Sequence, residues 1–197
     1  MLKIGLTGGI GSGKTMISNI FLKLGVPIFN SDFEAKKCIH ENNSLKNKLK
    51  NLYGDEIYMN GEIQSKKIAK IIFSNSKKLK ELNSLIHPYV NISYNNWLKN
   101  QSSKYIIKES AILFESNTNK KLDLIICVSA DDSLRLSRVM KRDNISKDKV
   151  RSIMNNQLEQ KQKMALSDFH INNDDELLIP QVLKLHNHFL EISDLKS

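Results

Sequence analysis

The sequence predicts an α/β fold in which helices cover a parallel sheet of about five strands, with a phosphate-binding loop, a helical insertion and a basic lid. Short apolar segments alternate with segments of helical spacing along much of the 197-residue chain. One of them, LDLIICVS at 122–129, is apolar apart from its edges, as expected for a strand buried on both faces. The motif GGIGSGKT at 8–15 adds a loop that requires a strand before it and a helix after it.

The individual elements follow from the same alternation. The segments with the length and apolar character of strands are Lys3–Thr7, Val26–Phe29, Tyr105–Lys108, Leu122–Ser129 and Phe169–Ile171. The segments with helical spacing are Lys14–Leu24, Asp132–Arg142, Ser146–Leu166 and Leu178–Leu190. This order predicts parallel strands joined by crossover helices.

The strand pattern stops between about residues 32 and 103, where apolar residues recur at helical spacing instead. These residues are Ile68, Ile71, Ile72, Leu79, Leu82, Leu85 and Ile86. Gly54 and Gly61 are expected to mark turns within this region. The expected domains are therefore a nucleotide-binding core of 1–31, 104–134 and 160–197, a helical insertion of 32–103 and a lid of 135–159.

Composition excludes some classes of protein. No apolar run approaches the roughly 18 to 20 residues that cross a bilayer, and the N-terminal MLKIGLTGG is typical of a strand, not of a signal peptide. Cys38 and Cys127 lie far apart without metal-like spacing, which favours a reducing cytoplasm. The net charge of +9 comes mostly from scattered lysines, so it favours attraction of small anions over nucleic-acid binding.

The motif at 8–15 matches G-x-x-x-x-G-K-[ST] in full, between the strand KIGLT and an amphipathic segment. Glycines let backbone N–H groups approach phosphate oxygens, and the following helix directs its positive dipole end at the same anion. Lys14 supplies a cation for the β- and γ-phosphates, and the Thr15 hydroxyl can ligate Mg²⁺. The expected nucleotide-binding residues of this segment are Gly11, Ser12, Gly13, Lys14, Thr15 and Met16.

Two carboxylates follow predicted strands at the edge where ligands bind in parallel sheets. Asp32 follows the second strand and is a candidate general base for an acceptor hydroxyl, or alternatively a helix cap. Glu109 ends the third strand and is a candidate Mg²⁺ ligand, or alternatively an exposed loop carboxylate. Glu115, further on, is a weaker candidate.

Arginine gathers between residues 135 and 151. Arg138 and Arg142 are four residues apart on a predicted helix and share one face, with Arg135 one turn earlier. Guanidinium groups suit a phosphoryl transition state whose charge is spread over several oxygens. The alternative is a solvated basic face paired with Asp131, Asp132 and Asp143. Beside a phosphate loop, a lid that closes over ATP is the favoured interpretation.

With these motifs in place, the sequence resembles the dephospho-coenzyme A kinase family along nearly its whole length. The loop form GGIGSGK is typical of the family. Leu24-Gly25 with Ser31-Asp32 resembles the family's LG…D-A-D motif, and Leu82-Asn83 with Ile86-His87-Pro88 resembles its LN…HP motif. Ile112–Glu115 is similar to the P-L-L-F-E segment, and Arg138–Asp143 to the lid, with Gln157 and Asn173 at family-like positions further on. Three residues depart from the family pattern: Asn30, Ala111 and Ser65. Because Asn30 stands in place of the first aspartate of D-A-D, only the last aspartate, Asp32, carries over.

The resemblance implies a phosphate-loop kinase that uses ATP and Mg²⁺ to phosphorylate the ribose 3′-hydroxyl of dephospho-coenzyme A, the last step of coenzyme A synthesis. Its implied catalytic residues are Asp32, Lys14 and Arg138. Arg142 and Asn173 join the ATP-binding set, His87 and Lys66 are assigned to the acceptor, and Thr15 and Glu109 to the metal. A monomer or weak oligomer without nucleic-acid or membrane partners is expected.

Two alternatives stay open. One is another phosphate-loop kinase, acting on a nucleoside monophosphate or a small alcohol. The other is a phosphate-loop switch or a nucleic-acid-associated ATPase. A GTPase would favour an N-K-x-D element, but Asn119-Lys120-Lys121 is followed by Leu122, and Asp123 comes one place too late. A nucleic-acid ATPase should interleave basic and aromatic residues, and only 7% of this chain is aromatic.

Overall fold

A computed structural model describes residues 1–64, 67–68 and 76–195. The chain divides into two compact units, of which the first comprises Met1–Asn30 and Gln101–Ser197 and the second Ser31–Asn100. Lys66, Ser65, Ile71 and Ile72, all named in the sequence analysis, lie outside the described residues.

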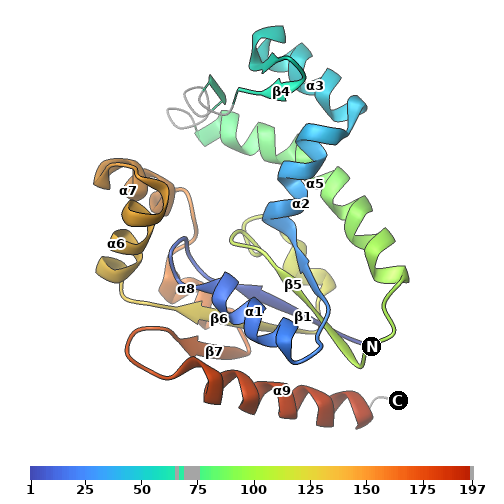
Figure 1. Ribbon diagram of the computed structural model, residues 1–197, viewed down its shortest axis with the longest axis vertical. Coiled ribbons are helices and arrows are strands. Elements are labelled where there is room, and N and C mark those ends of the chain that lie inside the picture. Colours follow the sequence, from blue (N-terminus) through green and yellow to red (C-terminus); the bar gives the residue numbers. More distant parts are fainter. Residues whose placement is uncertain (65–66, 69–75, 196–197) are drawn as a thin grey trace. The chain divides into compact units, whose positions relative to one another are not determined.

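The first unit contains a parallel five-stranded sheet in the order β2-β5-β1-β6-β7, which confirms the predicted fold class (Figure 1). Its strands are β1 (Leu2–Thr7), β2 (Ile28–Asn30), β5 (Tyr105–Glu109), β6 (Leu124–Ser129) and β7 (Phe169–Asn172). All five were predicted, with ends that differ by up to two residues. Because β1 lies at the centre and its neighbours come from later in the chain, the loop after β1 sits where the strand order reverses, which is where ligands bind in open parallel sheets.

The helices of this unit are α1 (Lys14–Lys23), α6 (Asp132–Asp143), α7 (Lys147–Asn155), α8 (Gln160–Ala165) and α9 (Leu178–Leu195), with a 3-10 helix at Thr118–Lys121. The prediction of one helix over Ser146–Leu166 was wrong. The segment forms α7 and α8, separated by a connection at 156–159 whose side chains and backbone are bonded to other parts of the unit.

The core of the first unit explains which helices cover which face of the sheet. Apolar residues of α1 and α9, among them Phe21 and Phe189, join Ile4 and Leu6 of β1 in one buried cluster. A Cβ at Gly5, which faces the other side, would meet Leu113 and Leu122. Side chains therefore cover both faces of β1, as its apolar sequence predicted.

The second unit is mainly helical, as expected, and contains α2 (Ser31–Glu41), α3 (Asn43–Tyr53), the 3-10 helix Asp55–Ile57 and α5 (Ser76–Lys99). The strands β3 (Tyr58–Met59) and β4 (Glu62–Ile63), which were not predicted, form a short antiparallel hairpin that is separate from the main sheet. Its turn places Asn60 and Gly61 at φ 52° and 81°, the left-handed conformations of a tight hairpin turn.

Helix α5 continues through Pro88. The missing N–H of a proline removes one helical hydrogen bond. Burial of Leu82, Ile86, Val90 and Tyr94 along the same helix compensates for that loss. In the described part of the chain, no helix combines the length and the apolar character needed to span a bilayer.

Candidate active site

The loop between β1 and α1 has the conformation that its glycines require. Gly13 adopts φ 97° immediately before α1, a backbone conformation that other residues rarely take. A Cβ at Gly9 would collide with the Arg135 guanidinium, and one at Gly13 with the Asn173 side-chain amide. The glycines thus allow other side chains of the unit to lie directly against the loop backbone.

Lys14, the cation of the motif, lies at this loop and not in solvent. It is 8% exposed, and its Nζ donates to the carbonyl oxygens of Gly8 at 2.9 Å and Gly9 at 3.3 Å. The ammonium is therefore already placed among the backbone groups of the phosphate-binding motif. Ser12 is also buried, whereas the Met16 side chain is 58% exposed on α1.

Glu109 ends β5 and is 3% exposed, so the alternative of an exposed loop carboxylate does not hold. It accepts hydrogen bonds from the Thr15 hydroxyl at 3.4 Å, the Ser18 hydroxyl at 2.7 Å and the Asn30 amide at 3.0 Å. The two predicted metal ligands, Thr15 and Glu109, thus lie together. Asn30, which departs from the D-A-D pattern, is uncharged, so it donates a hydrogen bond to the Glu109 carboxylate without neutralising its negative charge.

Several buried polar atoms around the loop have no hydrogen-bond partner among the described residues. They are Thr7 Oγ1 at the end of β1, Ser12 Oγ in the loop and Arg138 Nη1 on α6. A buried donor left unpaired costs about 1–3 kcal/mol. Such atoms are rare in proteins. Thr7 and Ser12 belong to β1 and the loop, and Arg138 is linked to the loop through Asn173, which bonds the Ser12 carbonyl. Their chemistry fits a ligand rich in anionic oxygens.

The three arginines of α6 have different environments. Arg135 is 5% exposed and bonded to the loop, and Arg138 Nη2 donates to the Asn173 carbonyl at 3.0 Å. Arg142 has a side chain that is 62% exposed and paired with Asp143 at 2.7 Å, and this carboxylate raises the Arg142 pKa. The alternative of a solvated, paired basic face therefore describes Arg142 but not Arg135 or Arg138.

Asn173 follows β7 directly and reaches the phosphate loop from a distant part of the sequence. Its Nδ2 donates to the Ser12 carbonyl at 2.8 Å, and its own carbonyl accepts from Arg138. The structure thus brings together most of the predicted nucleotide-binding residues: the loop, Lys14, Thr15, Glu109, Arg138 and Asn173. Among the predicted ATP-binding residues, Arg142, Thr15 and Met16 are exposed.

The candidates of the second unit are placed on its helices. Asp32 is exposed in the first turn of α2, a helix that begins at Ser31, so it lies inside the helix and not at its N-cap. A carboxylate there is favourably placed for the helix dipole. His87 is half-buried on α5, next to Pro88. Lys66 lies outside the described residues.

Sequence reasoning missed one charged side chain that is fully buried in the described part of the chain. Lys163 on α8 has 0% exposure, and its Nζ pairs with Glu115 at 2.8 Å and donates to the Ala111 carbonyl. Glu115 also accepts from the Leu158 N–H at 2.8 Å. Glu115 therefore holds α8 and the preceding connection in place. Nothing in the sequence around Lys163 signals that this lysine is buried.

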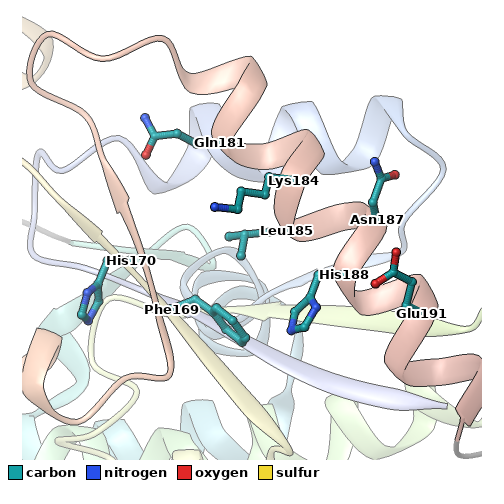
Figure 2. A pocket seen from close by; sticks show the side chains of 8 residues that line it. All are labelled: Phe169, His170, Gln181, Lys184, Leu185, Asn187, His188 and Glu191. Atoms are coloured by element: carbon teal, nitrogen blue, oxygen red, sulfur yellow. The ribbon is translucent and has the colours of Figure 1, made fainter.

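A separate groove of about 730 Å³ lies between β7 and α9 (Figure 2). Figure 2 shows Phe169 and His188 side by side at its floor, where their rings meet edge-on with centroids 5.5 Å apart. Gln181 bonds both the N–H and the carbonyl of Asn172 at 2.9 Å, so it satisfies a free backbone position of this edge strand. None of the predicted site residues lines this groove.

The assembled site agrees with comparisons to known proteins. The family model described as dephospho-CoA kinase matches residues 2–178. The chain belongs to the dephospho-CoA kinase family. Members of this family are ATP-using kinases, which fits the phosphate loop and the unpartnered polar atoms beside it.

Two relatives in this family are similar over nearly their whole length. The dephospho-CoA kinase of Porphyromonas gingivalis is 37% identical, with 94% of this chain and 93% of the relative aligned. That of Bacteroides fragilis is 36% identical over 93% of this chain and 91% of the relative.

Solved structures agree on the fold. A protein of Thermus thermophilus, TT1252, superposes with a TM-score of 0.84 at 26% identity, covering 96% of this chain and 97% of that one. The dephospho-CoA kinase of Campylobacter jejuni gives a TM-score of 0.67 at 22% identity, covering 99% and 98%. A shikimate kinase of Acinetobacter baumannii gives 0.52 at 15% identity, covering 98% and 94%, so a wider group of kinases shares the fold alone.

Proposed function

We propose that this chain transfers the γ-phosphoryl group of ATP to the ribose 3′-hydroxyl of dephospho-coenzyme A. The observation that carries the proposal is the family match over residues 2–178, which spans the loop, the helical unit and the arginine segment. The geometry of the loop adds independent support for the ATP half of the reaction, because it presents backbone groups, a cation and unpartnered donors in one place.

The loop and α1 supply the nucleotide-binding part of the proposal. Backbone N–H groups of Gly11, Ser12 and Gly13 and the positive end of α1 would bind the phosphates. The Lys14 ammonium donates hydrogen bonds to the Gly8 and Gly9 carbonyl oxygens. Its side chain would rotate away from these oxygens to reach the β- and γ-phosphates. Arg138, with one unpartnered nitrogen, would stabilise charge on the transferred group.

Thr15 and Glu109 would hold Mg²⁺ together with phosphate oxygens. In the described residues, no group of three or more His, Cys, Asp and Glu side chains could bind a metal ion by itself. Mg²⁺ in kinases commonly takes few protein ligands and several phosphate or water oxygens, so a hydroxyl and one buried carboxylate fit it. When bound, the ion would neutralise charge on the β- and γ-phosphates.

The second unit, Ser31–Asn100, would bind the acceptor. Asp32 is the proposed general base: an exposed carboxylate is free to accept a proton from an acceptor hydroxyl and to orient it for attack. His87 and Lys66 are the proposed acceptor contacts. Their support is the family resemblance of the LN…HP segment and the lysine-rich stretch around residue 66.

Residues 135–159 would act as the lid, with Arg142 joining the ATP phosphates on closure. Its support is the contrast between Arg138, held at Asn173, and Arg142, paired with Asp143 on the surface. Hydrogen exchange over residues 135–150 should slow when a non-hydrolysable ATP analogue is added. Unchanged protection would make the segment a passive surface helix.

The direct test is acceptor choice. The protein is incubated with ATP, Mg²⁺ and, in turn, dephospho-coenzyme A, nucleoside monophosphates and small alcohols, and the phosphorylated product is identified. Phosphate on the ribose 3′-oxygen of dephospho-coenzyme A, at a rate far above the other acceptors, is the expected result. Preferential phosphorylation of another acceptor, or ATP hydrolysis stimulated by DNA or RNA, would replace the proposal with one of the two alternatives.

We further propose that the protein works in the cytoplasm as a monomer or weak oligomer without nucleic-acid partners. Both cysteines, Cys38 and Cys127, are free and buried, which suits a reducing compartment. Sedimentation velocity over a range of protein concentrations, with and without duplex DNA, tests the assembly state and the absence of DNA binding together.

A further inference from the structure

We propose that Arg135 and Gln157 are positioning residues that hold the phosphate-binding loop in its anion-binding conformation through the backbone of Ile10. Gln157 Oε1 accepts the Ile10 N–H at 2.9 Å, and Arg135 Nε donates to the Ile10 carbonyl at 3.0 Å. Both polar groups of this one loop residue are therefore bound by side chains that lie 125 or more positions away in the sequence.

The Arg135 side chain is buried and hydrogen-bonded to several neighbouring groups. It is 5% exposed, and its Nη1 donates to Asp132 at 2.7 Å and to Gln160 at 3.2 Å. A Cβ added at Gly9 would collide with its guanidinium, and one at Gly11 with its backbone. A guanidinium that already has three protein acceptors is suited to fixing the loop and not to following a moving phosphoryl group.

Gln157 is held equally firmly by its own segment. It lies in the connection between α7 and α8, where the next residue, Leu158, donates its N–H to Glu115 at 2.8 Å. Gln160 bonds the Ala130 carbonyl at 2.9 Å, and Lys163 pairs with Glu115. The acceptor oxygen that meets Ile10 is thus anchored to segments that follow β5 and β6.

The loop needs such anchors because of its composition. Glycine occupies positions 8, 9, 11 and 13, and each glycine leaves its backbone with many accessible conformations. Ile10 lies between two of these glycines, so fixing its N–H and its carbonyl restricts the rotations on both sides. Restricting them before ATP binds removes an entropic penalty that binding would otherwise carry.

The inference rests on the proposed function only in taking this loop as the ATP-binding loop. Nucleotide affinity is therefore measured without any acceptor, by calorimetry with ADP and with a non-hydrolysable ATP analogue. The variants are Gln157→Leu, which removes the acceptor at similar size, and Arg135→Met. Their matched controls are Gln162→Leu and Lys161→Met, both at exposed positions on α8.

Gln157→Leu should weaken both nucleotides by about 3- to 10-fold, and Arg135→Met by about 10-fold or more, because hydrogen bonds to charged groups contribute more than neutral ones. The affinities for ADP and for the ATP analogue should fall by similar factors, because the substitutions act on the loop and not on the γ-phosphate. The KM for ATP should rise with kcat changed less than threefold, the signature of lost binding that is equal in ground and transition states. The controls should stay within about twofold of wild type.

The Ile10 amide proton gives a second readout that a general loss of stability would not reproduce. In NMR hydrogen exchange, its protection should fall in Gln157→Leu and return in Gln157→Glu, which keeps an acceptor oxygen. The double variant should lose less affinity than the product of the two single losses, because both side chains act on the same residue. If Arg135→Met fails to fold, Arg135→Gln, which keeps an N–H donor, takes its place in the same comparison.

Three results would overturn the proposal. The first is unchanged Ile10 protection or nucleotide affinity in Gln157→Leu relative to Gln162→Leu. The second is a loss confined to the ATP analogue in the Arg135 variant, which would make Arg135 a ligand of the γ-phosphate. The third is full additivity of the two substitutions. Failure of dephospho-coenzyme A as the acceptor would leave the nucleotide affinities and the Ile10 hydrogen exchange unaffected, because neither measurement uses an acceptor.

Discussion

The two compact units bury different kinds of side chain. Every buried charged residue in the described ranges belongs to the first unit, and these residues are Lys14, Lys108, Glu109, Arg135 and Lys163. The second unit buries apolar residues such as Leu45, Leu49 and Ile86, and the hydroxyl residue Ser31. Burying a charge is costly unless partners compensate it. The first unit supplies such partners: Lys14 donates to the Gly8 and Gly9 carbonyls, and Lys163 pairs with Glu115.

The ion pairs of the second unit are exposed, whereas the first unit has exposed pairs and also one whose lysine is fully buried. In the second unit, Lys37–Glu41, His40–Glu62 and Lys50–Asp55 are formed by exposed side chains. Pairs of this kind contribute about 0–1 kcal/mol. In the first unit, Lys163 is fully buried against Glu115. Substitution of exposed charges in the second unit should thus leave stability nearly unchanged, whereas substitution of the buried Lys163 in the first unit should lower it.

The largest effect is expected from Asp32→Asn in the second unit. The substitution keeps the shape but removes the charge that would accept the hydroxyl proton, so kcat should fall roughly 10²- to 10⁴-fold with little change in ATP affinity. Because Asp32 is exposed, the free energy of unfolding should change by less than about 0.5 kcal/mol. The matched control is Glu41→Gln at the other end of α2, which should leave kcat unchanged. Wild-type turnover in folded Asp32→Asn protein would remove Asp32 from the mechanism.

Next in size is the effect of Lys163→Met on stability. Removing one partner of a buried ion pair leaves Glu115 without its counter-charge and typically costs about 3–5 kcal/mol. Urea unfolding should show this loss in Lys163→Met and not in Lys161→Met, an exposed lysine on the same helix. A double variant, Lys163→Met with Glu115→Leu, should recover part of the loss because no unpaired charge remains. Equal stability of the two single lysine variants would show that the pair contributes nothing.

Lys14→Ala tests the charges of the first unit at the reaction itself. Without this ammonium, charge at the β- and γ-phosphates is less well neutralised, so turnover should fall on the order of 10²-fold or more. Lys23→Ala, an exposed lysine in the last turn of the same helix, is the control. Circular dichroism would establish that both variants fold. Near-normal turnover in Lys14→Ala would separate the loop motif from phosphoryl transfer.

Much of the fold could be predicted because apolar runs and glycines act locally. The five strands and the loop at 8–15 follow from such signals. Where the prediction of helices failed, long-range contacts decided the outcome: the connection at 156–159 is fixed by Ile10 and by Glu115. The hairpin of β3 and β4 had a local signal in Asn60-Gly61, of which the prediction used only the glycine.

The candidate site likewise has residues that local sequence signals predict and contacts that only the fold determines. Lys14, Thr15 and Glu109 could be named from the motif and from their places at strand ends. The contacts of Arg135 with Ile10 and of Lys163 with Glu115 could not, because they join residues 125 and 48 positions apart through the packing of the sheet. A sequence pattern shows that a lysine or arginine is present, but not that the fold buries it.

The smallest expected effect concerns Lys108, a buried lysine of β5. Burial, with Lys121 as a second cause, lowers the Lys108 pKa to about 8 from its ordinary 10.5. Between these two values the unfolded chain binds a proton that the folded chain does not, so the free energy of unfolding should rise with pH. We expect a gain of about 1–2 kcal/mol from pH 8 to pH 10 for wild type relative to Lys108→Met.

The comparison with Lys108→Met is needed because other groups titrate in the same range with the opposite sign. Burial raises the Cys127 pKa to about 11 and also raises the Tyr105 pKa, so both residues reduce stability as the pH rises. Their contributions are common to both proteins and cancel in the difference. Urea unfolding at half-unit steps from pH 7 to pH 10 should give a difference that is flat below about pH 8 and then rises. A difference that stays flat to pH 10 would mean that Lys108 remains protonated in the sheet, with its charge compensated by a partner in the folded state.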